Sequence, residues 1–457
     1  MSFFFNTISG SRNKSFITDG DKSYDYKDIN YKIKKLKKDY EIEGLILNIT
    51  KNTIDFLIGY LYFFEISKPQ LLIDQQTGIK SILQLIKRFK PNYLFIPNNI
   101  KDKFNYKKIF EIGQYVLLKT NFSKVKLNKD IAFLMPTSGS TGEQKFAKIS
   151  FNNIKSNTKN IIKYLKLNIN DCTITTLQPS YSYGMSILNT HILAKSSIIL
   201  TDKTLVQKEF WELYKKFPIT NFNGVPILYE FMSKFGLKNL YKDNLKFLTS
   251  AGGALDQKTL IEIVKFCEEN KIKYYSMYGQ TEASPRISYL LYPDFKDKIG
   301  SIGKAIPGGS LSIKNNEIIY TGSNIFGGYS NGYKDLKTFK KKYMLKTGDI
   351  GYQDNDGFIF ITGRSKRIAK LFGVRLNLDL IENSLKNKSI KCAIISTKNK
   401  VIIFHTNKTI NEEILEYLFE EFKILKTNVE FKHIKQIPKT KNNKINYSEL
   451  EKKNLYD

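Results

Sequence analysis

The sequence predicts an α/β protein: a large N-terminal domain of mixed, mainly parallel sheets with helices plus a small β-subdomain, and a small α+β C-terminal domain. The chain has 457 residues, which is too long for one ordinary hydrophobic core. Apolar segments of strand length alternate with helical segments over roughly the first 300 residues, as in sheets joined by crossover helices. Short strands replace this pattern from about residue 310, and a mixed pattern returns after Arg364.

The first 130 residues contain the clearest alternation. Short apolar runs bounded by polar turns predict strands at 44–48, 70–74 and 93–97 and a helix at 53–65. The run from Ile54 to Ile66 is the most apolar in the chain, but it is too short to span a bilayer and carries Asp55 and Glu65. We therefore expect a buried helix there and no transmembrane segment.

The alternation continues further along the chain, with strands expected at 131–134, 146–149, 197–200 and 245–249 and a helix at 152–165. Gly and Asn turns separate the short strands expected at 311–313, 317–320 and 357–361, which predict the β-subdomain. A helix at 378–385 and strands at 392–395 and 401–404 predict the separate small domain.

Composition limits the function classes. The formal charge of +30 allows a nucleic-acid binder, but the lysines are spread along the whole chain, so we expect no specific nucleic-acid site. The positive field suits small polyanions instead. The three cysteines lack disulfide or metal spacing, and the first residues lack the pattern of a signal peptide, so we expect a cytoplasmic protein without structural zinc.

The segment Met135–Lys145 carries the strongest chemical signal. It places hydroxyls, glycines and a lysine between two predicted strands. Glycines let the backbone approach an anion, hydroxyls and amides donate hydrogen bonds to it, and lysine adds positive charge. The segment therefore predicts a nucleotide phosphate site formed by Thr137, Ser138, Gly139, Ser140, Thr141, Gly142 and Lys145.

Two other kinds of segment fit these residues less well. A Walker loop requires Gly-Lys-Ser/Thr at the start of a helix, whereas Lys145 follows Gln144 and precedes a strand-like run. A Ser/Gly linker would not lie between apolar strands or end on lysine.

Two further segments can complete a nucleotide site. The strand ending at Tyr278 precedes Thr281 and Glu282, so an aromatic ring could lie on a purine while the hydroxyl and carboxylate contact phosphate and Mg²⁺. A strand edge with a surface turn explains this segment equally well on its own. Asp349 and Arg364 could hold ribose and phosphate through planar, charged hydrogen bonds.

These motifs together resemble those of the adenylate-forming (AMP-binding) superfamily, which includes acyl-CoA synthetases, amino-acid adenylation enzymes and luciferases. The phosphate segment is similar to Thr-Ser-Gly-Ser-Thr-Gly-x-Pro-Lys, with Gln144 in place of Pro. Residues 278–282 match Tyr-Gly-x-Thr-Glu, and Asp349 and Arg364 match the Thr-Gly-Asp and Gly-Arg elements. Residues 438–445 resemble Pro-Lys-Thr-x-x-Gly-Lys-Ile, with Asn443 in place of Gly, although alone they would read as a basic surface turn.

The resemblance implies an enzyme that uses ATP and Mg²⁺ to activate a carboxylic acid. It implies a catalytic role for Lys444, Thr281 and Glu282, with Glu282 binding Mg²⁺. It also implies adenine or ribose contacts from Gly253, Ala254, Tyr278, Asp349 and Arg364. Lys366 would be the hinge between a domain at 1–365 and a mobile lid at 366–457.

The acyl substrate is less well specified. Residues 178–186 hold aromatics and no acid, so an α-ammonium would lack a counter-charge, which argues against a free amino acid. Tyr181, Tyr183, Gly253 and Ser284 are candidate wall residues, and core packing explains the tyrosines equally well. Whether Arg286 pairs with a second substrate carboxylate or with a structural acid is open at this point.

Three functions remain from the sequence. The first is an acid–thiol ligase that passes the acyl group to coenzyme A. The second passes it to the phosphopantetheine arm of a carrier protein, and an acidic carrier would suit the basic chain. The third is a non-catalytic scaffold or nucleic-acid binder, against which the joint presence of Lys145, Glu282, Asp349, Arg364 and Lys444 argues.

Overall fold

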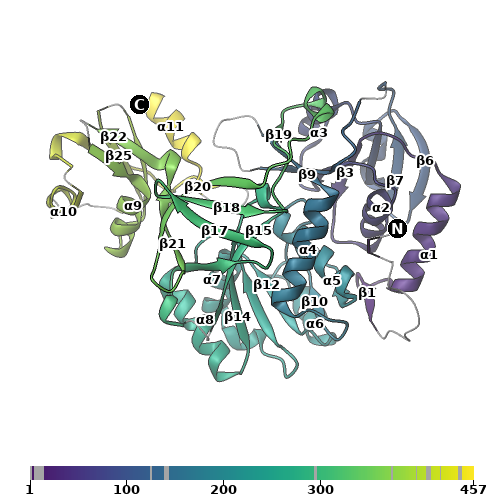
Figure 1. Ribbon diagram of the computed structural model, residues 1–457, viewed down its shortest axis with the longest axis horizontal. Coiled ribbons are helices and arrows are strands. Elements are labelled where there is room, and N and C mark those ends of the chain that lie inside the picture. The colour runs from purple at the N-terminus through teal and green to yellow at the C-terminus, as the bar shows by residue number, and fades with distance from the viewer. Residues whose placement is uncertain are drawn as a thin grey trace. The chain divides into compact units, whose positions relative to one another are not determined.

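The computed structural model describes residues 3–4, 15–123, 126–137, 144–292, 296–371, 374–397, 399–407, 413–422, 424–440 and 445–456 (Figure 1). The chain forms two compact units. The first comprises residues 1–138, 144–311 and 320–345, and the second comprises 139–143, 312–319 and 346–457. Among the described residues, no helix combines the length and apolar character that crossing a membrane requires.

The first unit contains a mixed sheet with the strand order β16-β15-β14-β13-β12-β10-β11-β1-β2. Pairing is parallel from β1 through β11, β10, β12 and β13 to β14, and antiparallel at both margins. The strands are β1 Phe16–Thr18, β2 Ser23–Asp25, β10 Cys172–Ile174, β11 Ser197–Ile199, β12 Asn221–Gly224, β13 Phe247–Ser250, β14 Lys273–Gly279, β15 Arg286–Tyr292 and β16 Ser301–Ala305.

A second sheet of the first unit has the order β19-β9-β8-β4-β3-β5-β7-β6. Its centre is parallel, and antiparallel pairs flank it on both sides. The strands are β3 Ile46–Thr50, β4 Gln70–Asp74, β5 Tyr93–Pro97, β6 Lys107–Ile112, β7 Tyr115–Lys119, β8 Ile131–Pro136, β9 Phe146–Ser150 and β19 Tyr329–Ser330.

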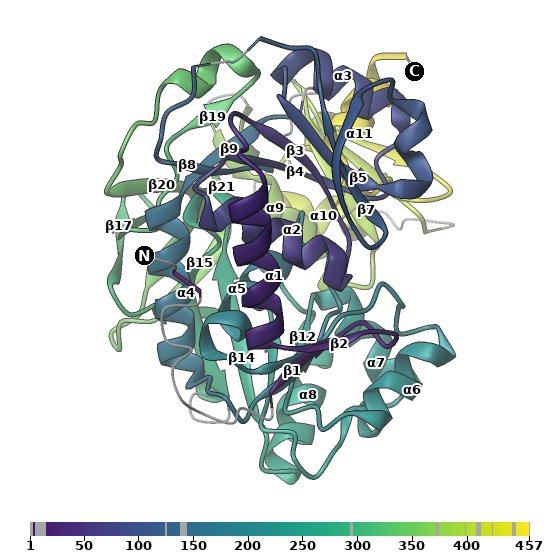
Figure 2. The ribbon, with the colours of Figure 1, turned by 90° about the vertical axis from the view of Figure 1, so that its right-hand side faces the viewer.

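Eight α-helices among the described residues of this unit pack on the sheets (Figures 1 and 2). They are α1 Tyr26–Asp39, α2 Ile54–Glu65, α3 Ile79–Phe89, α4 Phe151–Leu165, α5 Ser182–Ala194, α6 Lys208–Lys216, α7 Pro226–Phe235 and α8 Gln257–Glu269. Helices α1 and α2 lie side by side, as do α4 and α5. The expected α/β alternation is therefore confirmed.

Local sequence explains where α2 and α4 begin. Thr53 caps α2 by accepting from the amide of Phe56, and Ser150 forms a reciprocal capping box with Asn153. Helix α2 is buried from Ile54 to Phe64, as expected for the most apolar run of the chain. Its buried Asp55 is paired with Lys22 at 3.1 Å.

The hydrophobic core fixes the strand that leads into the predicted phosphate segment. Phe133 of β8 stacks on Tyr60 of α2, with ring centroids 5.4 Å apart and an interplanar angle of 9°. Phe64, one helical turn after Tyr60, also stacks on the Phe133 ring, with the ring centroids 5.8 Å apart. The strand before the phosphate segment is therefore held firmly against α2.

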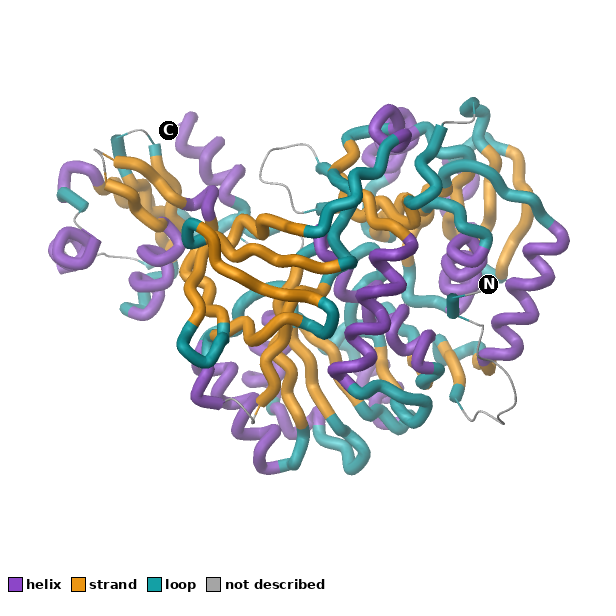
Figure 3. The backbone as a smooth tube through the Cα atoms, viewed as in Figure 1, coloured by secondary structure: helices purple, strands orange, loops and turns teal. Residues whose placement is uncertain are grey.

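The sequence boundaries of the two units fall inside three strands. These strands are β17 Gly309–Lys314, β18 Glu317–Gly322 and β20 Met344–Gln353. The rest of the second unit, as far as the structure describes it, contains short strands and three α-helices (Figure 3). These are β21 Ile359–Arg364, β22 Ile368–Leu371, β23 Val374–Asn377, β24 Cys392–Ser396, β25 Val401–His405, β26 Val429–His433, α9 Leu378–Asn387, α10 Glu413–Phe422 and α11 Tyr447–Tyr456. The division at residue 365 into a domain and a mobile lid stays a prediction.

Candidate active site

The predicted phosphate segment connects β8 to β9 in an antiparallel hairpin. Pro136 pairs with Phe146 in the register of this hairpin. The backbone amide and the hydroxyl of Thr137 both donate to the carbonyl of Lys145, at 3.0 and 3.1 Å. Thr137 and Lys145 thus meet at the base of the connection, while Ser138, Gly139, Ser140, Thr141 and Gly142 lie outside the described residues.

The Thr281–Glu282 segment follows β14 and forms a short 3₁₀ helix, Thr281–Ala283. Gly279 precedes it, at a position where a Cβ atom would clash with the carbonyl oxygen of Pro285. The hydroxyl of Thr281 hydrogen-bonds that of Ser182, at the start of α5, at 3.3 Å.

The side chain of Glu282 is oriented by a residue of the second sheet in the same unit. Its Oε1 accepts a 2.7 Å hydrogen bond from the hydroxyl of Tyr329 in β19. Tyr329 pairs with Ala147 of β9, the strand that leaves the phosphate segment. Glu282 makes no ion pair with any described residue, so its carboxylate can fit a hard cation such as Mg²⁺, which prefers oxygen ligands.

Two asparagines that the sequence analysis did not identify support this segment. The amide of Asn324 donates to the carbonyls of Ala283 and Arg286 at 2.5 and 2.8 Å, and Asn157 of α4 donates to Arg286 at 3.1 Å. The hydroxyl of Tyr320 donates to Oδ1 of Asn324 at 2.8 Å. Both asparagines are almost fully buried, and a buried amide requires such partners.

The predicted purine contacts come from two places in the chain. Gly253 and Ala254 follow β13, and Tyr278 lies in β14. Gly253 and Ala254 are exposed, and Tyr278 is partly buried against the core. Gly252, which was not predicted, has φ of +96° and lies so close to Tyr181 that a Cβ atom would clash with the tyrosine hydroxyl. This turn therefore requires glycine for both conformation and space.

The candidate acyl-wall residues differ in their surroundings. Tyr183 is buried, and its hydroxyl hydrogen-bonds Oγ1 of Thr249 at 2.6 Å, which is a packing role. Tyr181 is less buried and packs edge-on against Tyr183 with ring centroids 6.4 Å apart. Ser284 is buried, and its hydroxyl donates to the carbonyl of Asn324 at 2.8 Å.

In the second unit, Asp349 and Arg364 are register partners across the β20–β21 hairpin. Arg364 Nε lies 3.5 Å from Asp349 Oδ1. The preceding Gly348 has φ of +77°, and its amide donates to Glu317 at 3.0 Å. Thr347 caps the same turn by donating to the carbonyl of Ile318 at 2.8 Å. The two predicted ribose-binding side chains are therefore brought together.

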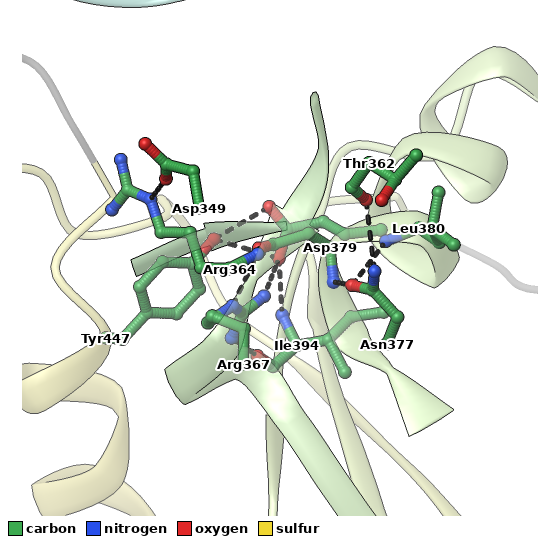
Figure 4. A network of polar contacts seen from close by, with 10 residues as sticks. Asp349, Thr362, Arg364, Arg367, Asn377, Asp379, Leu380, Ile394 and Tyr447 are labelled. Atoms are coloured by element: carbon green, nitrogen blue, oxygen red, sulfur yellow. Dashed lines mark hydrogen bonds and ion pairs between the residues drawn. The ribbon is translucent and has the colours of Figure 1, made fainter. Parts of the chain in front are cut away.

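Lys366 lies in a short exposed 3₁₀ helix, Ser365–Arg367, directly before a polar network (Figure 4). Arg367 pairs with Asp379 at 2.8 Å and with Glu382 at 2.9 Å. Asp379 also accepts from the backbone amide of Arg364 at 2.9 Å. The network fixes the chain on both sides of the predicted hinge residue.

The same network reaches the segment that carries the predicted catalytic lysine. The hydroxyl of Tyr447 donates to Glu382 at 2.9 Å, and the guanidinium of Arg367 lies 3.8 Å from the centre of the Tyr447 ring. Burial raises the pKa of Glu382, and Arg367 opposes this rise. Lys444 itself lies outside the described residues, three positions before Tyr447.

Comparisons with known proteins identify the family of this chain. The profile of the AMP-binding enzyme family matches residues 65–329. The chain is 24% identical to the 2-succinylbenzoate–CoA ligase of Lactococcus lactis, over 96% of this chain and 97% of that protein. It is 25% identical to the D-alanine–D-alanyl carrier protein ligase of Listeria monocytogenes, over 81% of each chain.

A solved structure shares the fold. The O-succinylbenzoate coenzyme A synthetase of Bacillus subtilis, in complex with ATP and magnesium ion, superimposes with a TM-score of 0.76 at 16% identity, over 98% of this chain and 99% of that one. The family profile covers more than half of the chain, and the relatives are ligases. The chain therefore belongs to the AMP-binding enzyme family and is an AMP-forming, acyl-CoA synthetase-like ligase.

Proposed function

We propose that this ligase uses ATP and Mg²⁺ to adenylate a carboxylic acid and then transfers the acyl group to the thiol of coenzyme A. The observation that carries the proposal is the placement of Glu282. Its carboxylate is held by Tyr329 on the strand that pairs with β9, where the phosphate segment ends. A carboxylate at that place suits a metal ion bound to nucleotide phosphates.

The first step joins a substrate carboxylate oxygen to the α-phosphorus of ATP, and the bond from that phosphorus to the bridging oxygen breaks to release pyrophosphate. In the second step the thiol loses its proton to solvent, its sulfur attacks the acyl carbon, and AMP leaves as the bond between the acyl carbon and the phosphate oxygen breaks. The first step needs no general base, so the protein mainly orients the reactants and offsets negative charge.

Each predicted residue has a part in these steps. Lys444 offsets charge between the carboxylate and the α-phosphate, and the segment from Thr137 to Lys145 holds the departing pyrophosphate. Asp349 and Arg364 hold the ribose, and Tyr278 packs on adenine. Mg²⁺, bound through Glu282, would supply further charge neutralisation at the phosphates.

The acceptor distinguishes this proposal from its nearest alternative. One relative is named for coenzyme A and the other for a carrier protein, and the match to the first covers more of the chain. We therefore place coenzyme A first and an acidic carrier second. The net charge of +30 suits either acceptor.

Pyrophosphate release with ATP and Mg²⁺ across a panel of carboxylic acids, with and without coenzyme A, tests the proposal. We expect acid-dependent release and a coenzyme A thioester. Release without a thioester would favour the carrier protein. Binding of ATP without release for any acid would overturn the proposed activity.

A further inference from the structure

Arg286, the first residue of β15, is a fully buried cation. It is 2% exposed. Its guanidinium carbon lies 4.7 Å from the centre of the Tyr183 ring, and one terminal nitrogen lies 3.5 Å from the hydroxyl of Ser186. Its Nε has no hydrogen-bond partner, and no described carboxylate forms an ion pair with the side chain.

The surrounding tyrosines cannot supply the missing negative charge. Burial raises the pKa of Tyr164 to about 12, and Arg286 opposes this rise without reversing it. Burial raises the pKa of Tyr181 and of Tyr183 as well. All three hydroxyls are therefore neutral near pH 7.

The contacts of Arg286 do not compensate for its burial. A desolvated cation–π contact offsets only part of the free-energy cost of burying an ion. The rest of that cost stands unless a counter-charge and further hydrogen bonds offset it. The 3.5 Å contact with Ser186 and a hydrogen bond with the neutral hydroxyl of Tyr164 leave Nε unpartnered and supply no counter-charge, so an anion brought to this place would be favoured.

The position of Arg286 connects it to the proposed active site. Asn324 holds the carbonyls of both Arg286 and Ala283, so the arginine backbone is fixed to the segment that carries Thr281 and Glu282. The ring under its guanidinium belongs to α5, whose Ser182 contacts Thr281. Arg286 thus lies beside the residues expected to surround the acyl group.

We propose that Arg286 binds a second carboxylate on the acyl substrate, so that the enzyme selects dicarboxylic acids; this inference rests on the proposed adenylation. A guanidinium holds a carboxylate through two parallel hydrogen bonds, and its unpartnered Nε supplies one of them. One carboxylate is adenylated, and the other undergoes no bond change. A monocarboxylic acid leaves the arginine charge unpaired and is rejected by on the order of 10²-fold or more.

The test uses the full-length enzyme with ATP and Mg²⁺ and measures pyrophosphate release. Substrates are a series of straight-chain dicarboxylic acids, with the monocarboxylic acid and the monoamide of the same length beside each. The variants are Arg286→Met, Arg286→Lys and, as a control away from this site, Arg88→Met. Circular dichroism and ATP binding report on the integrity of each variant.

For the wild type and Arg88→Met, we expect kcat/KM at least about 10² higher for the best diacid than for its monoacid. Arg286→Met should abolish this preference, because its kcat/KM for the diacid falls while its kcat/KM for the monoacid stays the same or rises. Arg286→Lys should retain part of the ratio because it keeps the charge without the paired geometry.

Two results would overturn the inference while leaving adenylation intact. One is a wild type that prefers monoacids or monoamides, which needs no folded variant to observe. The other is a folded, ATP-binding Arg286→Met protein that loses activity equally on both substrate types, since that marks a structural arginine. Absence of release with every acid would instead overturn the proposed function together with this inference.

Discussion

The carboxylate of Glu282 accepts a 2.7 Å hydrogen bond from the hydroxyl of Tyr329, which lies 47 residues further along the chain. Tyr329 belongs to β19, which pairs with β9 at the end of the phosphate segment. One hydrogen bond therefore connects the candidate metal ligand to the hairpin expected to bind phosphate. The orientation of Glu282 therefore depends on a residue that was not among the predicted site residues.

Replacement of Glu282 by Gln should raise the Mg²⁺ concentration needed for half-maximal pyrophosphate release, because an amide oxygen binds a hard cation more weakly than a carboxylate does. Tyr329→Phe should raise it less, by roughly tenfold, because one hydrogen bond to a charged group is lost. Titration of Mg²⁺ at saturating ATP measures both. Unchanged Mg²⁺ dependence in Glu282→Gln would exclude the metal role.

Asp349→Ala should raise KM for ATP by roughly 10- to 100-fold, because charge-assisted hydrogen bonds to ribose are lost. The wild type should discriminate against 2′-deoxy-ATP and 3′-deoxy-ATP, and the variant should not. Asp356→Ala, in an exposed turn of the same hairpin, is the control. Equal discrimination by Asp349→Ala and the wild type would contradict the ribose role.

Lys444→Ala should lower the rate of pyrophosphate release by roughly 10²–10³, the usual effect of losing one preorganised charge donor. Thermal stability should change little. Lys441→Ala, in the same basic segment, serves as the matched control and should keep most of the activity. A normal rate for Lys444→Ala would show that the lysine is not catalytic.

Tyr447→Phe tests whether the network around Arg367 positions the lysine segment. Loss of the hydrogen bond to Glu382 should lower kcat for adenylation roughly tenfold with little change in KM for ATP. Tyr417→Phe, which loses a hydroxyl contact with Ser384 in the same unit, should cost similar stability without this loss of rate. Equal rates for the two variants would leave Tyr447 with a structural role alone.

His191 predicts a pH dependence of stability. It is 1% exposed, and burial lowers its pKa. The unfolded chain, with a His pKa of about 6.5, then binds more protons than the folded one. The free energy of unfolding should therefore be at its full value above about pH 6.5 and should fall at lower pH, by at most about 1.4 kcal/mol per pH unit for one proton.

Urea unfolding of wild type, His191→Gln and the exposed control His433→Gln, from about pH 8 to pH 5, measures this dependence. His191→Gln should show a shallower fall in midpoint than the other two proteins. His405, whose pKa is lowered by burial, contributes equally in the wild type and in His191→Gln, whereas His433→Gln also removes a neighbouring charge that lowers the pKa of His405. Identical slopes would exclude His191 as the source.

The local sequence pattern was sufficient to predict the bounds of a strand where clear turn residues lie on both sides of it. The predicted strands at 70–74 and 93–97 coincide with β4 and β5. The strand predicted at 44–48 begins two residues later, because Gly44 has φ of +106° beneath the side chain of Asn92. The strand predicted at 357–361 likewise begins two residues later, after a turn at Gly357 with φ of +84°.

The elements and residues that the sequence did not predict depend on contacts between residues far apart in the chain. The β6–β7 hairpin was not predicted, because its turn at Gly113 packs against the carboxylate of Asp55, far away in the chain. Asn324 and the bond from Tyr329 to Glu282 were missed for the same reason, since the partners lie about 40 residues earlier. Asp349 and Arg364, by contrast, are paired within one hairpin, and their motifs identified them correctly as neighbours.

The ion pair between Lys22 and Asp55 bears on where a shorter version of this protein could begin. Lys22 follows β1, and the nearby Asp19 accepts from the amide of Ile54 at the start of α2. A fragment beginning after residue 25 would leave the buried carboxylate of Asp55 without its cation, which destabilises the folded chain. The first two strands, although short and at the sheet margin, thus contribute to the stability of α2.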